Sequence, residues 1–112
     1  MKRDHYLCLQ PFLHRKSARQ KIILYLIAAG YSVPDLVKLD VPTLRSLALP
    51  IDLAVLMDEF MEGRKSGPAF RYPNGQAMPH TAFYRLIRTT SKKVTGKPMT
   101  QDQFRAWIRK TQ

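Results

Sequence analysis

The sequence predicts a small, mainly all-α domain, on three observations. Apolar residues recur every three or four positions over four long segments, which is the spacing of an amphipathic helix. Residues that cap or begin helices come at the start of these segments, and glycine follows three of them. Glycine and proline are concentrated in residues 63–78, so we expect a loop there, with room for one short β-hairpin near 69–78. A chain of 112 residues can bury a core as one domain.

The charge of the chain is strongly basic and unevenly distributed. The formal net charge is +11. It is +5 over residues 1–21, −4 over 22–62 and +10 over 63–112. An acidic middle beside a strongly basic C-terminal half predicts a directed surface that meets a polyanion such as nucleic acid.

A few residues bear on compartment and cofactors. The single cysteine, Cys8, excludes an internal disulfide and fits a reducing compartment. No secretory signal is visible, and the longest apolar run, residues 22–29, is too short to cross a membrane. We therefore expect a cytoplasmic protein without membrane partners. His5, Cys8 and His14 lack a fourth ligand at a recognised spacing, so we expect no metal and no cofactor.

Residues 1–16 are expected to form a basic N-terminal arm, followed by a single helical DNA-binding domain over 17–112. The first helix is predicted over 18–29, after Ser17 as its N-cap. Its buried stripe is expected to comprise Ile22, Ile23, Leu26 and Ile27, and its exposed face Arg19 and Lys21.

The middle of the chain is expected to be an acidic scaffold. Ser32 with Asp35 forms a capping-box pattern, and Asp40 with Thr43 begins another short helical turn. A longer helix with an acidic outer face is predicted over 53–62. Its buried residues are expected to be Leu53, Leu56, Met57 and Phe60.

One helix, predicted over residues 79–95, carries the basic half of the chain. Its apolar side is expected to bury Phe83, Leu86, Ile87, Thr90 and Val94. The opposite side carries Thr81, Arg85, Arg88 and Lys92, and no acid. A solvated helix face usually mixes both signs of charge, so a face of one sign predicts contact with nucleic acid. A plain basic surface is the alternative.

A last helix is predicted over residues 101–110, after Thr100 as its N-cap. It is expected to bury Phe104, Trp107 and Ile108, and to expose Arg105, Arg109 and Lys110. Nowhere does a histidine accompany a serine or cysteine at a recognisable nucleophile spacing. We therefore expect no enzyme activity.

Two segments resemble the tyrosine recombinases, the phage-integrase family. The connection from Leu39 to Thr43 is too short for a helix-turn-helix, whereas residues 29–44 resemble the first signature box of that family. The matching positions are Gly30, Asp35, Leu36 and Leu39. The order of the later segments is also similar to the family's catalytic domain: a loop with Phe70 and Asn74-Gly75, the helix beginning PHTAFYRLIR, then Thr100 to Arg105 in place of the second box.

The departures from the family's pattern concern its catalytic residues. Ser32 stands where the first box has an arginine, and Asp102 where the second box has a histidine, although Arg105 is kept. Residues 40–50 leave no room for the hairpin that carries the family's lysine, and no tyrosine nucleophile follows Arg105. The resemblance therefore implies a shortened, catalytically inactive domain whose helix over 79–95 lies against the DNA major groove.

These observations predict a non-catalytic, sequence-specific double-stranded DNA-binding protein, an accessory or regulatory factor of a mobile element such as a plasmid or phage. The residues expected to contact bases in the groove are Thr81, Arg85, Arg88, Thr89 and Lys92. Those expected to contact phosphates are Lys93, Lys97, Arg105, Arg109, Lys110 and Arg71.

Two other functions remain open from the sequence. The chain is alternatively a protein-interaction module that docks on a recombinase or another DNA-processing enzyme through its acidic middle or through apolar patches near Tyr31 and Met57. A second alternative is a single-strand or RNA-binding protein, in which Tyr84 and Tyr72 stack on bases beside basic residues.

Overall fold

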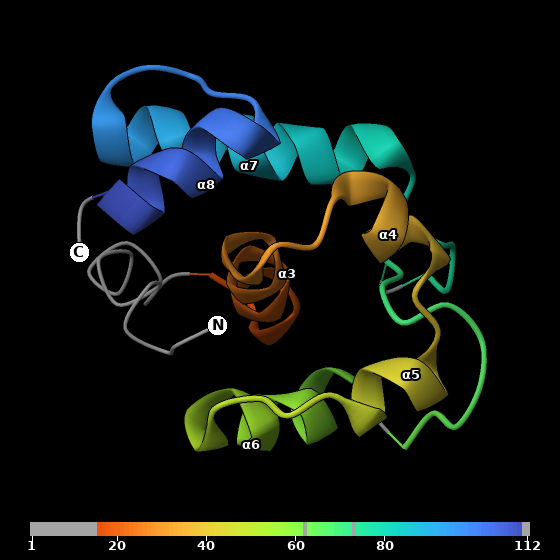
Figure 1. Cartoon of the computed structure of the whole chain (residues 1–112). Helices are drawn as coiled ribbons and strands as arrows, with labels where there is room; N and C mark the ends of the chain where they lie inside the picture. The colour runs from red at the N-terminus through yellow and green to blue at the C-terminus, as the bar shows by residue number, and fades with distance from the viewer. Residues whose placement is uncertain (1–15, 62, 73, 111–112) are drawn as a thin grey trace.

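The described part of the chain folds into six α-helices. The computed structural model describes residues 16–61, 63–72 and 74–110, apart from the side chain of Phe60. Most of the predicted basic arm, with His5, Cys8 and His14, and the predicted burial of Phe60 lie outside the described residues. The helices are α3 (Ala18–Ala29), α4 (Val33–Lys38), α5 (Val41–Ser46), α6 (Ile51–Met61), α7 (His80–Thr95) and α8 (Gln101–Lys110) (Figure 1). The prediction of a mainly all-α fold is confirmed.

Helix α3 is the central helix of the fold. Figure 1 shows it nearly end-on, with α6 on one side and with α7 and α8 on the other. Every side chain over residues 22–28 is buried. The predicted burial of Ile22, Ile23, Leu26 and Ile27 is confirmed. Burial is not confined to that stripe, because neighbouring helices pack on more than one side of α3 and cover Leu24 and Tyr25 as well. Arg19 and Lys21 are half-buried instead of fully exposed.

Side-chain caps begin four of these helices at the residues that the sequence indicated. The capping pairs are Ser17 with Gln20, Ser32 with Asp35, Asp40 with Thr43, and Thr100 with Gln103. Each cap gives an otherwise unpaired backbone N–H of the first turn an acceptor. Gly96 ends α7 with a φ of 87°, a left-handed conformation that glycine adopts without strain.

Helix α6 buries one side and exposes an acidic one. Leu53, Met57 and Met61 are buried, and Leu56 is half-buried. The prediction for this helix is thus confirmed for Leu53 and Met57 and partly for Leu56. The exposed residues of the helix are Ile51, Asp52, Ala54, Val55, Asp58 and Glu59.

The loop between α6 and α7 forms a closed turn beside α7. Backbone N–H groups of Tyr72 and Met78 donate to the carbonyl oxygens of Gln76 and Phe70, at 2.8 and 3.2 Å. An antiparallel bridge joins residues 71 and 77, but no strand forms in the described residues. The hairpin allowed near 69–78 is therefore reduced to this bridge. The Phe70 ring meets the Phe83 ring of α7 edge-on at 5.9 Å, which holds the loop against the helix.

The inner side of α7 packs on the rest of the fold as the sequence predicted. Its buried residues are Phe83, Leu86, Ile87, Thr90 and Ser91, with Val94 half-buried. This burial fixes which side of the helix faces solvent.

Within the described residues, no helix is both long enough and apolar enough to span a membrane.

Candidate nucleic-acid interface

The outward side of α7 carries a row of cations. We call this side the cationic face; its exposed residues are Thr81, Arg85, Arg88, Thr89 and Lys92. The face is fixed by the buried side of the same helix, because residues three or four apart in a helix lie on one side. The structure therefore brings together on one surface all five residues predicted to contact bases, with the exposed Lys93 on the flank of that surface.

The cations of this face have no acidic partner within the described residues. Ion pairs in that part of the chain join Arg45 to Asp58 at 3.6 Å and Arg105 to Asp102 at 3.3 Å, both away from the cationic face. Lys92 and Lys93 lie in the last turn of α7, where the partial negative charge of the helix end favours cations. The face is thus a region of uncompensated positive charge, which suits an anionic partner.

The two threonines of the cationic face differ in whether their hydroxyl groups already make hydrogen bonds. The Thr89 hydroxyl donates to the carbonyl oxygens of Arg85 and Leu86, at 2.9 and 3.2 Å. Its proton is therefore committed to the helix backbone, and its oxygen is left to accept. Thr81 lies in the first turn, exposed, and makes no hydrogen bond with its side chain in the described part of the chain.

The residues predicted to contact phosphates are spread more widely. Lys97 is exposed just beyond Gly96, and Arg109 and Lys110 are exposed in the last turn of α8. Arg71 is half-buried in the loop before α7. Because α8 packs on both α7 and α3, the cations of α8 lie on a different helix from the cationic face.

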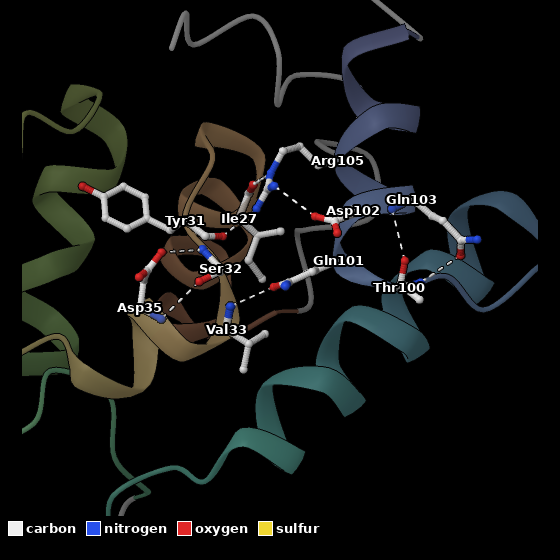
Figure 2. A network of polar contacts seen from close by, with 10 residues as sticks. All are labelled: Ile27, Tyr31, Ser32, Val33, Asp35, Thr100, Gln101, Asp102, Gln103 and Arg105. Carbon is white, nitrogen blue, oxygen red and sulfur yellow. Dashed lines mark hydrogen bonds and ion pairs between the residues drawn. The ribbon is translucent and has the colours of Figure 1, made fainter.

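Arg105 does not lie where the sequence predicted. Its side chain is only 16% exposed. Its Nε donates to the carbonyl oxygen of Ile27 at 2.8 Å, its Nη2 to that of Tyr31 at 2.7 Å, and its Nη1 meets Asp102 (Figure 2). These carbonyls lie at and beyond the C-terminal end of α3, where the last turn of a helix has unpaired acceptors. We therefore correct the prediction that Arg105 is an exposed cation: it joins α8 to α3.

Gln101 makes a further hydrogen bond between α8 and the backbone near the turn after α3. Its side-chain oxygen Oε1 accepts a hydrogen bond from the backbone N–H of Val33 at 2.7 Å. Figure 2 shows Gln101 and Arg105 extending from α8 to the two sides of the turn between α3 and α4. The C-terminal helix is thus positioned by polar contacts as well as by the buried Phe104 and Ile108.

Two basic residues beside the cationic face were missed by the sequence analysis. Arg19 Nη1 donates to the carbonyl oxygen of Arg71 at 2.7 Å, and its guanidinium lies over the Tyr72 ring, 5.9 Å from the centroid. Burial lowers the pKa of the Lys16 ammonium below its ordinary value, and the positive charge of Lys93 lowers it further. Neither contact can be predicted from local sequence, because Arg19 meets the loop before α7 and Lys16 lies close to Lys93 of α7.

Exposed acids lie on α6, across the molecule from α7, and also at the starts of α4, α5 and α8, as Asp35, Asp40 and Asp102. The exposed acids of α6 are Asp52, Asp58 and Glu59. Figure 1 shows α6 and α7 on opposite sides of α3. In the described part of the chain, no group of three or more His, Cys, Asp or Glu side chains is placed to hold a metal ion. The distinctive feature of the surface is therefore the cationic face of α7, which carries no acid of its own.

Comparison of the chain with protein-family models, with curated proteins and with solved structures finds no match. The resemblance to the tyrosine recombinases stays a prediction. A function for this chain therefore has to be argued from its charge, its geometry and its chemistry.

Proposed function

We propose that this protein binds double-stranded DNA through the cationic face of α7, without catalysing a reaction on it. The observation that carries the proposal is that Arg85, Arg88 and Lys92 are all exposed on one side of one helix, with Lys93 on the flank, and that no acid is paired to them in the described residues. Uncompensated Lys and Arg charge is what contact with DNA phosphates requires.

The dimensions of α7 suit the major groove. The helix has 16 residues and is therefore about 24 Å long. The major groove of B-DNA is about 12 Å wide and admits an α-helix. In that position Arg85 and Arg88 are placed to donate two hydrogen bonds to guanine, while Lys92 and Thr81 reach neighbouring base edges. Thr89 would act as an acceptor.

Cations around the helix would hold the sugar-phosphate backbone. Lys93 flanks the cationic face, Lys97 follows the helix, and Arg109 and Lys110 end α8. Contacts of this kind set the register of a protein on DNA without reading sequence. Arg71 is a weaker candidate because it is half-buried, and Arg105 is removed from the set because its guanidinium is occupied.

A biological setting follows from the resemblance to the tyrosine recombinases. A domain that keeps the DNA-contacting helix of that family and lacks its catalytic residues would serve as an accessory or regulatory factor. We propose that it acts in the cell interior on DNA of a mobile element, alone or beside a recombinase.

Fluorescence anisotropy with a labelled duplex tests the proposal. The wild-type chain should bind, and log affinity should fall with log salt with a slope of about −4, as for four or five phosphates neutralised. Arg88→Gln should weaken binding about tenfold. The matched control is Lys38→Gln, which removes an equally exposed cation from α4 and should leave the affinity unchanged. Equal effects of the two variants, or tighter binding of single strands or RNA than of duplex, would contradict the proposal.

A second candidate function, docking on another protein, is favoured by one feature of α6. Ile51 and Val55 are 80% and 67% exposed, four residues apart on the same side of the helix. Asp52, Asp58 and Glu59 surround this apolar pair. Apolar side chains rimmed by charge are typical of protein contact sites. Substituting both apolar residues with serine should leave DNA affinity unchanged, so a loss of DNA binding would argue against two separate surfaces.

A further inference from the structure

A cavity of about 250 Å³ lies between the start of α3, the loop that ends at Met78, and the first half of α7. Cations dominate its polar lining, which comprises Lys16, Arg19, Gln20, Arg85 and Thr89. Met78 and Leu86 contribute apolar surface. No acid among the described residues lines it. Three cations around one cavity without a counter-charge are suited to an anion.

Arg19 is held in place with donors to spare. One of its nitrogens, Nη1, bonds to the Arg71 carbonyl, and the guanidinium is supported by the Tyr72 ring. Its Nε is buried and makes no hydrogen bond within the described chain. This buried Nε is closed off from the cavity, so an anion would be held by the terminal N–H groups of the guanidinium that the Arg71 carbonyl does not take. Orientation by Arg71 and Tyr72 means that little side-chain freedom is lost when a ligand arrives.

Lys16 adds an unfavourable charge that an anion would relieve. It is half-buried at the cavity, and Lys93 is close enough to disfavour its charged form. Like charges brought together in this way repel, and a phosphate bound beside Lys16 would offset the repulsion with charge-assisted hydrogen bonds. Arg85 and Thr89 belong to both the cavity and the cationic face, so the two sites are continuous.

We propose that this cavity is a phosphate site, which takes one phosphate ester with its sugar while the strand that carries it runs along α7. Cavities for drug-sized ligands begin at about 300 Å³, so this one suits a sugar-phosphate unit better than a whole cofactor. The phosphate would lie between Lys16 and Arg19, and the sugar against Met78 and Leu86, while Arg85 at the edge of the cavity stays free to reach a base. The same chemistry is presented by a backbone phosphate of DNA and by a free nucleotide. Where the source is DNA, the proposal rests on the function proposed above.

Lys16→Met is the main test variant, because methionine keeps an unbranched apolar stem and loses the charge. Duplex affinity should fall about tenfold, by the same factor on specific and random sequences. The slope of log affinity on log salt should become shallower by about 0.9, since one phosphate contact is lost. Arg19→Gln should act in the same direction, and a failure of that variant to fold leaves the Lys16 test intact. Lys38→Met, on α4, is the matched control and should match the wild type.

A second measurement separates the two sources of phosphate. Deoxyadenosine monophosphate is titrated into the wild-type chain, and the side-chain NMR signals of Lys16 and Arg19 are followed. Arg19 shifts that are absent in Lys16→Met, together with the changed salt slope on duplex, would support a phosphate site filled by DNA. Shifts in a protein that does not bind duplex would support the site with a free nucleotide as its source, and would contradict the function proposed above. Normal duplex binding by Lys16→Met and Arg19→Gln, without nucleotide shifts, would overturn the phosphate site alone. If the wild-type chain shows no nucleotide shifts and does not bind duplex, both the phosphate site and the function proposed above are overturned.

Discussion

The guanidinium of Arg105 in α8 donates a 2.7 Å hydrogen bond to the carbonyl oxygen of Tyr31, in the turn that follows α3 (Figure 2). A second bond from the same group reaches the Ile27 carbonyl at 2.8 Å. A cation therefore closes the C-terminal end of the central helix, where the helix dipole favours positive charge. The two residues are 74 positions apart in sequence. This contact fixes α8 on α3 and thereby helps to set the position of α7, which packs on α8.

The first prediction is that Arg105 acts on stability. Arg105→Ala should lower the free energy of unfolding by about 2–3 kcal/mol, because two charge-assisted hydrogen bonds are lost and two carbonyl groups are left without them. The melting temperature should fall by roughly 10 °C. Lys110→Ala, an exposed cation on the same helix, is the control and should change stability by less than about 0.5 kcal/mol. Calorimetry checks both, and an Arg105 variant as stable as the control would contradict the assignment.

The second prediction contrasts two adjacent buried residues of α7. The Thr90 hydroxyl is buried without a hydrogen bond in the described chain. Thr90→Val removes this unpaired group at nearly constant volume and should stabilise the fold by about 1 kcal/mol. The Ser91 hydroxyl accepts from the Met99 N–H at 2.8 Å and donates to the Arg88 carbonyl at 3.1 Å. Ser91→Ala should therefore destabilise the fold by about 1–2 kcal/mol. Urea unfolding of the pair gives both values, and changes of the same sign would be inconsistent with this reading.

The third prediction separates reading of sequence from attachment to phosphate. Arg88 projects from the middle of the cationic face, whereas Lys93 lies on its flank and faces Lys16. Arg88→Ala should reduce the discrimination between specific and random duplex by about 1–3 kcal/mol. Lys93→Ala should weaken both duplexes alike and make the salt slope shallower by about 0.9. Binding isotherms at several salt concentrations distinguish the two patterns; if both variants lose affinity equally on every duplex, Arg88 does not contact bases.

The fourth prediction concerns acid unfolding. Hydrogen bonds from the Thr43 side chain and backbone lower the pKa of Asp40 below its ordinary value of 3.8. Bonds from the Ser32 backbone and side chain do the same for Asp35. A carboxyl whose pKa is lower in the folded state stabilises the fold above its ordinary value, and that contribution is lost as the pH falls below 3.8. Stability should therefore decline as the pH falls below that value.

Asp40→Asn tests this origin of the acid sensitivity. Asparagine also accepts the bond from the Thr43 N–H, so stability near neutral pH should change little. The loss of stability below pH 3.8 should be smaller than in the wild type, because one titrating carboxylate is gone. Denaturant unfolding at several pH values measures this, and an unchanged acid profile would exclude Asp40 as a contributor.

The sequence was most informative where structure is local. The caps at Ser17, Ser32 and Thr100 and the buried side of α7 follow from spacing and side-chain chemistry within a few residues. The cationic face of α7 was predictable for the same reason, since it is the complement of a well-defined apolar stripe. Its exposure and lack of acidic partners are therefore confirmed by the structure, within the described residues.

The failures concern residues whose environment is set by distant segments. Helix periodicity put Arg105 on an outer side, but a long side chain can turn back to a neighbouring helix end, and the end of α3 has unpaired carbonyls. Arg19 was likewise expected to face solvent, and the loop at Arg71 and Tyr72 covers it. The complete burial of α3 was missed because a single sequence does not show how many neighbours surround a helix. These contacts depend on tertiary packing.

The most direct test of the central claim, that the cationic face binds duplex DNA, is a selection from randomised duplexes with the purified wild-type chain at physiological salt. The claim predicts enrichment of a short motif whose binding is lost in a variant with both Arg85 and Arg88 changed to alanine. If the selected duplexes share no enriched motif, and the double variant retains as much duplex as the wild type, the claim is contradicted.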